Sequence, residues 1–328
     1  MQNRVCRLMA VAAVAATASM VAGAQAVSTV IPFSAPTSGI SVDPVRNKVY
    51  VVAPDPSGTI FNLAVIDGES DAITSTISLT AGAQFPAVDY LANRIYVTAC
   101  NQSDACVVQV INGATDKVVS TIPITSKAGG GLTGIVVNPL TGLVYVANAS
   151  NNVIDIVDGR NAKLIGSISL KTNSPSAIAL NPVLNLLYVP YGSNQVGVID
   201  AWNGQVLSTS TFGTDTVGAA VNVLTGNVYV TDLEFSGSTS LTGVLNLTGH
   251  VTTSVTVNDF PMGVDVDPFT NLAFVASPLS EQLTVINGAN NTVKTTISGI
   301  QAEYVAVNPA TQTVYTSGQI GVTVVAEK

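Results

Sequence analysis

The sequence contains few residues of the kinds that most catalytic and nucleic-acid-binding sites need. Its 328 residues include one histidine, and 12 lysines and arginines stand against 20 aspartates and glutamates. Nucleic-acid-binding proteins use basic side chains to displace counterions from phosphates, so this balance argues against such a partner. Charged residues make up 10% of the chain and hydrophobic residues 47%. This composition excludes a disordered linker.

Long apolar runs are also scarce, and one of them lies at the start of the chain. Leu8–Val21 is apolar and alanine-rich, follows Arg4 and Arg7, and precedes a short segment of small residues. This order predicts a secretory signal peptide over residues 1–26. No later segment reaches the run of about 18 apolar residues that a membrane-spanning helix needs. Removing the peptide leaves 10 basic and 20 acidic residues, a formal charge of −10. We expect residues 27–328 to form a single exported domain.

Cysteine is scarce as well. Cys6 falls in the predicted signal peptide, which leaves Cys100 and Cys106 in the mature chain. These two flank five residues of a predicted hairpin loop, where paired strand ends bring α-carbons within the reach of a disulfide, about 7 Å. We therefore expect a disulfide between Cys100 and Cys106. The alternatives are two free thiols or a metal pair, but no other cysteine or nearby histidine completes a metal site. No cofactor is expected.

What the sequence does contain is an internal repeat of seven units. In each unit an aromatic residue follows an apolar run, and an Asp or Asn lies seven residues before it. The aromatic residues are Tyr50, Tyr96, Tyr145, Tyr188, Tyr229, Phe274 and Tyr315. The turn residues are Asp43, Asp89, Asn138, Asn181, Asn222, Asp267 and Asn308. Proline follows five of them, which is typical of a tight turn whose first residue accepts backbone hydrogen bonds.

The spacing of the repeat predicts the architecture. Each unit holds a strand, a tight turn, a second strand, a third that ends in a turn such as Asp67-Gly68, and a Ser/Thr-rich fourth. Successive aromatic residues are separated by 46, 49, 43, 41, 45 and 41 residues. A period near 40 to 50 with four strands predicts an all-β, seven-bladed β-propeller with four-stranded antiparallel blades. First strands such as TGIVVN are apolar almost throughout, as expected when both faces are buried.

The start of the mature chain completes this pattern. The segment VSTVIPF (Val27–Phe33) nearly repeats VSTIPI (Val119–Ile124), which is the fourth strand of the second unit. The seventh unit contains only three strands before Lys328. We therefore expect Val27–Phe33 to supply the outer strand of the last blade, so that no open sheet edge is left where the ring closes.

The repeat resembles a known family. The segment NPLTGLVYVANASNNVIDIVDG (Asn138–Gly159), with VYVTD at Val228 and RIYVTAC at Arg94, is similar to the repeats of YVTN-type β-propeller proteins, which include YncE-like and surface-layer propellers. The resemblance covers essentially the whole mature chain. It implies an extracytoplasmic propeller and carries no catalytic residue to transfer, because turn and core chemistry is what recurs.

Candidate functional residues gather on one predicted face of the ring. If the strands of a blade are lettered A to D from the axis outward, the B–C loops and the blade-to-blade connections share this face. It would hold the Cys100–Cys106 loop, the Gly129–Gly131 connection and the excursion Asp232–Gly243. Its acids are Asp55, Asp104, Asp215, Asp232, Glu234, Asp259, Glu281 and Glu303, against Lys127 and Lys171. They serve either solubility alone or a cation or basic ligand near the channel mouth.

Their positions in the repeat suggest an order. We expect Asp215, Asp259 and Glu303 nearest the axis, because they lie in connections that lead into first strands. The outer rim of the candidate ligand site would be formed by Asp232, Glu234 and Phe235. Aromatic residues near this face serve as stacking surfaces or as packing; they are Phe85, Tyr191, Phe235 and Phe260.

One further acid stands out. Asp265 occupies an inner-strand position where the other blades carry small or apolar residues, such as Ala87 and Val136. A carboxylate there needs hydrogen-bond partners or a shifted pKa. We expect a structural buried acid rather than a functional one.

No catalytic constellation emerges from the sequence. His250 maps to the C–D turn of blade five, and the mature arginines, Arg46, Arg94 and Arg160, map to A–B or C–D turns on the opposite face. We expect a monomeric, exported, non-enzymatic binding or scaffold propeller at the cell envelope, whose partner is a protein, a glycan or a small cationic ligand. One alternative is an enzyme of the propeller lactonase or lyase type, which the missing histidines disfavour. The other is a structural surface-layer component.

Overall fold

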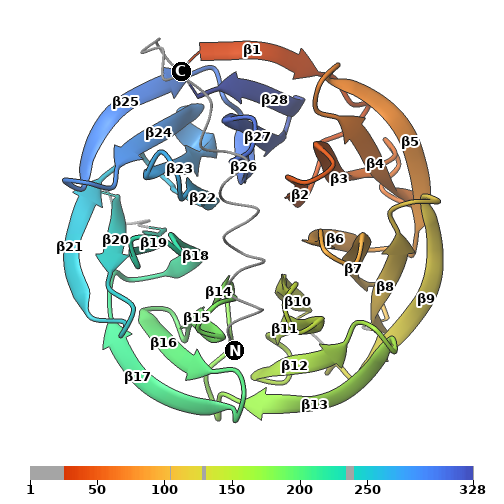
Figure 1. Ribbon diagram of the computed structural model, residues 1–328, viewed down its shortest axis with the longest axis horizontal. Coiled ribbons are helices and arrows are strands. Elements are labelled where there is room, and N and C mark those ends of the chain that lie inside the picture. The colour runs from red at the N-terminus through yellow and green to blue at the C-terminus, as the bar shows by residue number, and fades with distance from the viewer. Residues whose placement is uncertain (1–25, 104, 128–130, 234–239, 328) are drawn as a thin grey trace.

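Seven four-stranded antiparallel sheets surround a central axis, as Figure 1 shows. The computed structural model describes residues 26–103, 105–127, 131–233 and 240–327. The fold confirms the all-β, seven-bladed propeller expected from the repeat. Apart from Ala26, the predicted signal peptide lies outside the described residues.

Six blades use four consecutive strands, with the first strand of each nearest the axis (Figure 1). Blades one to three comprise β2 (Ile40–Asp43), β3 (Lys48–Pro54), β4 (Phe61–Asp67), β5 (Ala72–Leu79), β6 (Ala83–Asp89), β7 (Arg94–Cys100), β8 (Cys106–Asn112), β9 (Lys117–Ile124), β10 (Leu132–Asn138), β11 (Leu143–Asn148), β12 (Val153–Asp158) and β13 (Lys163–Ser169). Blades four to six comprise β14 (Ala179–Asn181), β15 (Leu186–Tyr191), β16 (Gln195–Asp200), β17 (Gln205–Thr211), β18 (Thr216–Val221), β19 (Val228–Asp232), β20 (Leu241–Leu245), β21 (Val251–Thr256), β22 (Val264–Asp267), β23 (Leu272–Ser277), β24 (Gln282–Asn287) and β25 (Thr292–Ser298).

Blade seven joins the two ends of the described chain. It contains β26 (Ala302–Asn308), β27 (Thr313–Gly318), β28 (Gly321–Ala326) and, as its outer strand, β1 (Ala26–Ile31). Ala26 pairs with Ala326, Ile31 pairs with Val322, and Ile31 is buried. The expected closure by the N-terminal segment is therefore confirmed, although the strand begins one residue before Val27 and ends before Pro32.

The A–B turns form as their chemistry dictates. In all seven blades the side-chain oxygen of the recurrent Asp or Asn accepts a backbone N–H two residues later, as from Val45 to Asp43 at 2.9 Å. Four residues after the Asp or Asn, the backbone turns left-handed, for example at Asn47 with φ 50° and Gly142 with φ 76°. Asparagine and glycine tolerate that conformation better than most residues do. These local bonds fix the first hairpin of every blade.

Adjacent blades are held together by apolar clusters and by their B-strand tyrosines. The tyrosine hydroxyl reaches the C–D turn of the next blade, where Tyr188 donates to the Leu247 carbonyl at 3.1 Å. At Gly159 an added Cβ would clash with the hydroxyl of Tyr96, which explains the glycine in that turn. Phe274 is the exception among these aromatics. Glu327 stands in blade seven at the position where four other blades have the turn glycine.

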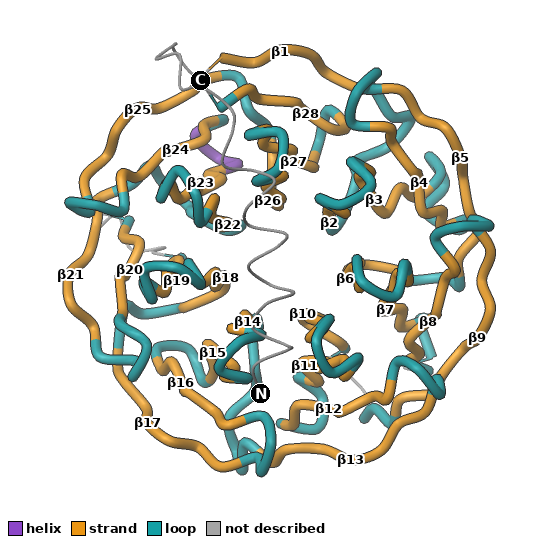
Figure 2. Tube along the Cα trace, viewed as in Figure 1, coloured by secondary structure: helices purple, strands orange, loops and turns teal. Residues whose placement is uncertain are grey.

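Helix is nearly absent from the described residues, where a three-residue 3₁₀ segment, η1 (Pro278–Ser280), is the one helical element (Figure 2). No helix in this part of the chain has the length and apolar character needed to cross a membrane.

Candidate functional site

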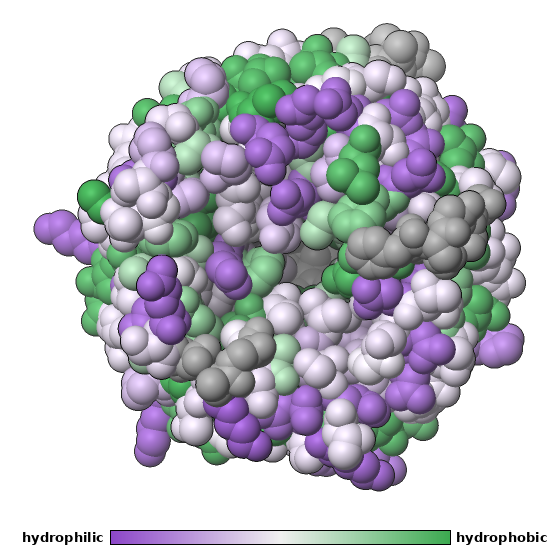
Figure 3. All heavy atoms as spheres, turned by 180° about the vertical axis from the view of Figure 1, so that it is seen from behind, coloured by the Kyte–Doolittle hydropathy of each residue, from purple (hydrophilic) through white to green (hydrophobic). Residues whose placement is uncertain are grey.

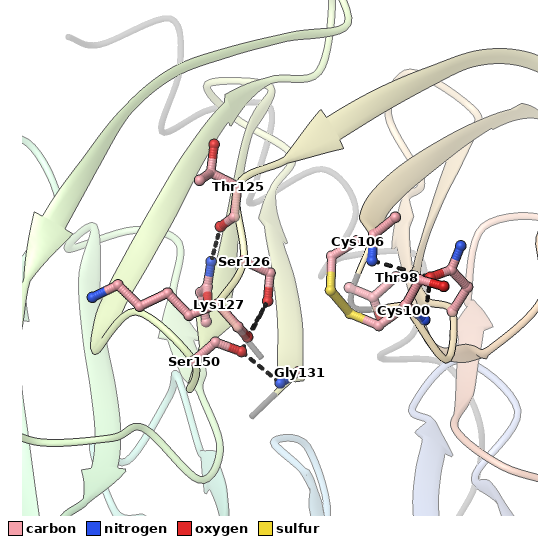
Figure 4. The surroundings of a disulfide bond; sticks show 12 residues. Thr98, Cys100, Cys106, Thr125, Ser126, Lys127, Gly131 and Ser150 are labelled. Atoms are coloured by element: carbon pink, nitrogen blue, oxygen red, sulfur yellow. Dashed lines mark hydrogen bonds between the residues drawn. A yellow bond between two sulfur atoms is a disulfide. The ribbon is translucent and has the colours of Figure 1, made fainter. Parts of the chain in front are cut away.

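The B–C loop of blade two carries a disulfide at its base (Figure 4). Cys100 and Cys106 lie directly opposite each other on β7 and β8, with α-carbons 4.1 Å apart and their sulfurs bonded. The expected disulfide is thus present. Beside it, the Ser150 hydroxyl accepts hydrogen bonds from Ser126 and from the Gly131 N–H, which fastens both ends of the connection into blade three (Figure 4).

Reduction of this disulfide is expected to lower the free energy of unfolding by about 2 kcal/mol, because the bond restrains the unfolded chain. Urea unfolding with and without reductant measures the effect. In a Cys100→Ser/Cys106→Ser variant, the reductant should change nothing. Two free thiols per mature chain under non-reducing, denaturing conditions would refute the bond.

A cavity of about 200 Å³ lies in the central channel, and bulges in the first strands shape it. The register of β10 skips Thr133, that of β18 skips Val217, and that of β26 skips Glu303. All three skipped residues line the cavity. A bulge re-aims the extra side chain, so the strand delivers it to the channel rather than to a blade interface. Viewed from the side opposite to Figure 1, the ring is hollowed at its centre (Figure 3).

One wall of the cavity is aromatic. Phe85 of blade two and Tyr304 of blade seven make an edge-to-face pair with ring centroids 5.7 Å apart and planes inclined by 75°. Thr98 holds the Phe85 backbone, since its hydroxyl accepts the Phe85 N–H at 3.2 Å. Burial, and next the charge of Glu303, raises the pKa of the Tyr304 hydroxyl to about 12, so it stays neutral.

Of the three acids expected nearest the axis, Glu303 alone lines the cavity. Asp215 is half-buried next to Asp232, and its pKa is raised first by burial and then by that neighbouring charge. Asp259 is exposed, and its carbonyl oxygen accepts a hydrogen bond from the Ser280 hydroxyl. Of the three acids, a ligand in the cavity would thus meet Glu303.

The predicted outer rim also differs from the structure. Asp232 is only 2% exposed, and its carboxylate accepts the backbone N–H groups of Thr214 and Asp215, each at 2.8 Å. Gly213, with φ 67°, lets the connection pass directly over this carboxylate. Asp232 therefore fastens the connection into β18 instead of facing a ligand. The other two rim candidates, Glu234 and Phe235, lie outside the described residues, as does Asp104.

Two further acids of this face, Asp55 and Glu281, have hydrogen-bond partners within the protein. Asp55 accepts hydrogen bonds within its own loop, and the bond from the Ser57 hydroxyl is the main reason that its pKa falls to about 2. Glu281 accepts a hydrogen bond from the Gln301 amide at 2.6 Å.

The other aromatic candidates are placed for packing. Tyr191 is buried, and its hydroxyl bonds with Thr209. Phe260 is half-buried and does not line the cavity.

Asp265 lies farther along the channel, in a second widening of about 370 Å³. Its carboxylate accepts the N–H of Val266 and, across the blade interface, the N–H of Val307, both at 2.8 Å. Burial against the channel wall raises the pKa of Asp265 to about 6, although part of the residue faces the channel space. It thus has both the partners and the shifted pKa that its position demands, and it connects blades six and seven.

The histidine and arginines lie away from the cavity, in the turns where the repeat placed them. His250 is exposed in the turn between β20 and β21. Arg46 forms an ion pair with Asp43 at 2.9 Å and donates to the Tyr90 carbonyl of the next blade. Arg94 donates to the carbonyls of Gly159 and Arg160.

Tyr304, like Thr133 and Val217, is a site residue that the sequence expectations missed. Its signal is positional: it lies four residues before the recurrent Asn308, and at this offset most blades have glycine. An aromatic residue at a glycine position marks a blade that differs from the others.

Comparison with known proteins supports the fold. No family model matches the sequence, and no curated protein matches it. Among the solved structures with a similar fold is hydrazine synthase of Kuenenia stuttgartiensis, with a TM-score of 0.73 and 15% identity, covering 94% of this chain and 99% of that chain. At this identity the likeness shows a shared fold and nothing of function.

Proposed function

We propose that this chain is a YVTN-type propeller exported to the cell envelope, where it acts as a non-enzymatic binding or scaffold module and takes its ligand in the channel cavity. The proposal rests on one observation: β-bulges place Thr133, Val217 and Glu303 in the lining of one concave site. Rigid scaffolds that present a few polar groups in a mostly apolar concavity are typical of small-molecule sites.

Two features support this assignment. The Cys100–Cys106 disulfide suits an oxidising compartment, because such bonds persist mainly outside the cytosol. The cavity lining combines one carboxylate, one tyrosine and one threonine with apolar and backbone groups. Such a set suits the binding of a small molecule, in which a few polar groups fix the orientation of the ligand.

Thermal unfolding against divalent cations, lactones, peptides, glycans and small organic cations tests the proposal. A ligand of the folded state at about hundredfold excess over its Kd adds about 2.7 kcal/mol of stability. Ala177 lines the cavity, so Ala177→Trp is expected to fill it and abolish the stabilisation. Ala114→Trp, at an exposed C–D turn position, is the matched control and should leave it intact. Turnover of a lactone, or equal loss in both variants, would reject the proposal.

A further inference from the structure

The cavity breaks the sevenfold repeat of the ring on one side. Seven positions, each four residues before the recurrent turn Asp or Asn, line it, and we call them the mouth positions. Five of them are small and two are aromatic: Gly39, Phe85, Gly134, Ala177, Gly218, Gly263 and Tyr304. The small residues are explained by packing, since at Gly218 and Gly263 an added Cβ would meet backbone of the next blade. The aromatic ones need another explanation.

The two aromatic side chains meet across the blade that separates them. Blade one lies between blades two and seven, and its mouth position is Gly39. An added Cβ there would lie 2.6 Å from the Gln84 carbonyl oxygen and 3.0 Å from the Phe85 α-carbon. Because Gly39 has no side chain, Phe85 and Tyr304 approach each other in the edge-to-face pair. The result is a fixed aromatic wall on one side of the channel.

A carboxylate adjoins this wall. Glu303 immediately precedes Tyr304 on β26, lines the same cavity and is half-buried. Within the described part of the chain, no residue donates a hydrogen bond to the Glu303 side chain or forms an ion pair with it. No lysine or arginine is among the residues that line the cavity. A negative charge, an aromatic wall and apolar neighbours such as Met262 and Val264 therefore share one small space.

We propose that the ligand of this cavity is a small organic cation with an apolar body, such as a quaternary or alkyl ammonium group; this rests on the proposed binding function. The cationic head lies against the aromatic pair and the Glu303 carboxylate, and its alkyl groups contact the apolar wall. Aromatic faces attract cations through their quadrupole, most strongly where water is excluded. The net negative charge of the chain attracts cations in general.

The same lining disfavours other ligand classes. Calcium takes six or more oxygen ligands, and magnesium takes oxygen ligands in near-octahedral geometry. The cavity offers one carboxylate among largely apolar walls. An anion would meet Glu303 without a basic partner among the lining residues. The cavity volume of about 200 Å³ also falls below the range of sites for drug-sized molecules, which selects a small ligand.

Calorimetric titration with choline and with its neutral isostere, in which a tert-butyl group replaces the trimethylammonium group, tests the ligand class. The two molecules match in shape and differ in charge. Choline is expected to bind the wild-type protein roughly fivefold to thirtyfold more tightly than the isostere. Equal affinity, or no binding of choline at millimolar concentration, would overturn the inference.

Three variants assign the effect to its residues. Glu303→Gln and Phe85→Leu should each weaken choline binding by roughly fivefold or more while leaving the isostere almost unaffected. Asp259→Asn removes an acid that does not line the cavity and should change neither affinity. If the ligand proves to be neutral or anionic, and its binding is lost in Ala177→Trp but not in Glu303→Gln, the proposed ligand class is wrong but the binding function stands. Failure of every ligand to respond to Ala177→Trp would reject both.

Discussion

Deletion of Val27–Phe33 is expected to lower the free energy of unfolding by roughly 3–6 kcal/mol and to cause aggregation. The deletion removes four of the five paired positions between β1 and β28 and the buried side chain of Ile31. Each net hydrogen bond contributes about 1 kcal/mol and a buried isoleucine about 2 kcal/mol. It also exposes β28 as an open edge, to which other chains can add. Urea unfolding and light scattering of the mature protein measure both effects.

A strand exchange provides the control for this deletion. Replacing Val27–Phe33 with Val118–Ile124 of β9 keeps isoleucine and proline at the positions of Ile31 and Pro32. Because covering the edge requires a strand of the right pattern and not one particular sequence, the exchange should restore most of the lost stability. A deletion that leaves the midpoint of unfolding unchanged would contradict the role assigned to β1.

The fold was predictable because its determinants are local and recur. Each blade has an Asp or Asn whose side chain bonds the backbone two residues on, and a left-handed residue completes the turn. Such chemistry depends on neighbours in the sequence and is readable there. Ring closure was predictable for the same reason, since β1 carries the pattern of an outer strand.

The site was less predictable because bulges decide which side chains reach the channel. The repeat assigned Asp215, Asp259 and Glu303 to connections into first strands, which made them look equivalent. Relative to the recurrent turn residue, however, Glu303 lies five positions before it, at the same offset as Thr133 and Val217. Asp215 lies seven positions before and Asp259 eight. Asp215 and Asp259 therefore lie before β18 and β22 begin, whereas Glu303 occupies the bulge of β26 that turns its side chain towards the channel. The position of a bulge cannot be read from the sequence alone.

The interface between blades six and seven, where the ring closes, differs from the other blade interfaces in its polar contacts. At the other interfaces a B-strand tyrosine hydroxyl points to the C–D turn of the next blade. Blade seven has no C–D turn, because its fourth strand comes from the start of the chain, and blade six has Phe274 in place of the tyrosine. Glu327 occupies the turn position, and its N–H donates to the Gln312 carbonyl as the turn glycines do at their sites. Its side chain is 6% exposed and accepts a hydrogen bond from Thr270 at 2.8 Å. Asp267 of blade six is the neighbouring acid.

Stability is therefore expected to fall as the pH rises from about 4.5 to about 8. Burial first, and then the charge of Asp267, raises the pKa of Glu327 to about 8 from 4.5, while Lys294 opposes the shift. The folded protein thus holds a proton that the unfolded chain releases at lower pH. The stabilisation is complete below about 4.5 and is lost as the pH passes about 8, at up to about 1.4 kcal/mol per pH unit. Urea unfolding at a series of pH values measures it.

Glu327→Gln isolates this group from the other titrating acids. Glutamine retains an amide donor towards Asp267 but carries no titrating proton, so the variant should lose most of the pH slope between about 6 and about 8. Asp265, with its pKa raised to about 6, contributes in the same direction at lower pH, and Asp265→Asn separates that part. If Glu327→Gln kept the wild-type slope, the proton would belong elsewhere. The predicted result would instead show that the interface between blades six and seven, where the ring closes, is the part of the protein that loses stability as the pH rises.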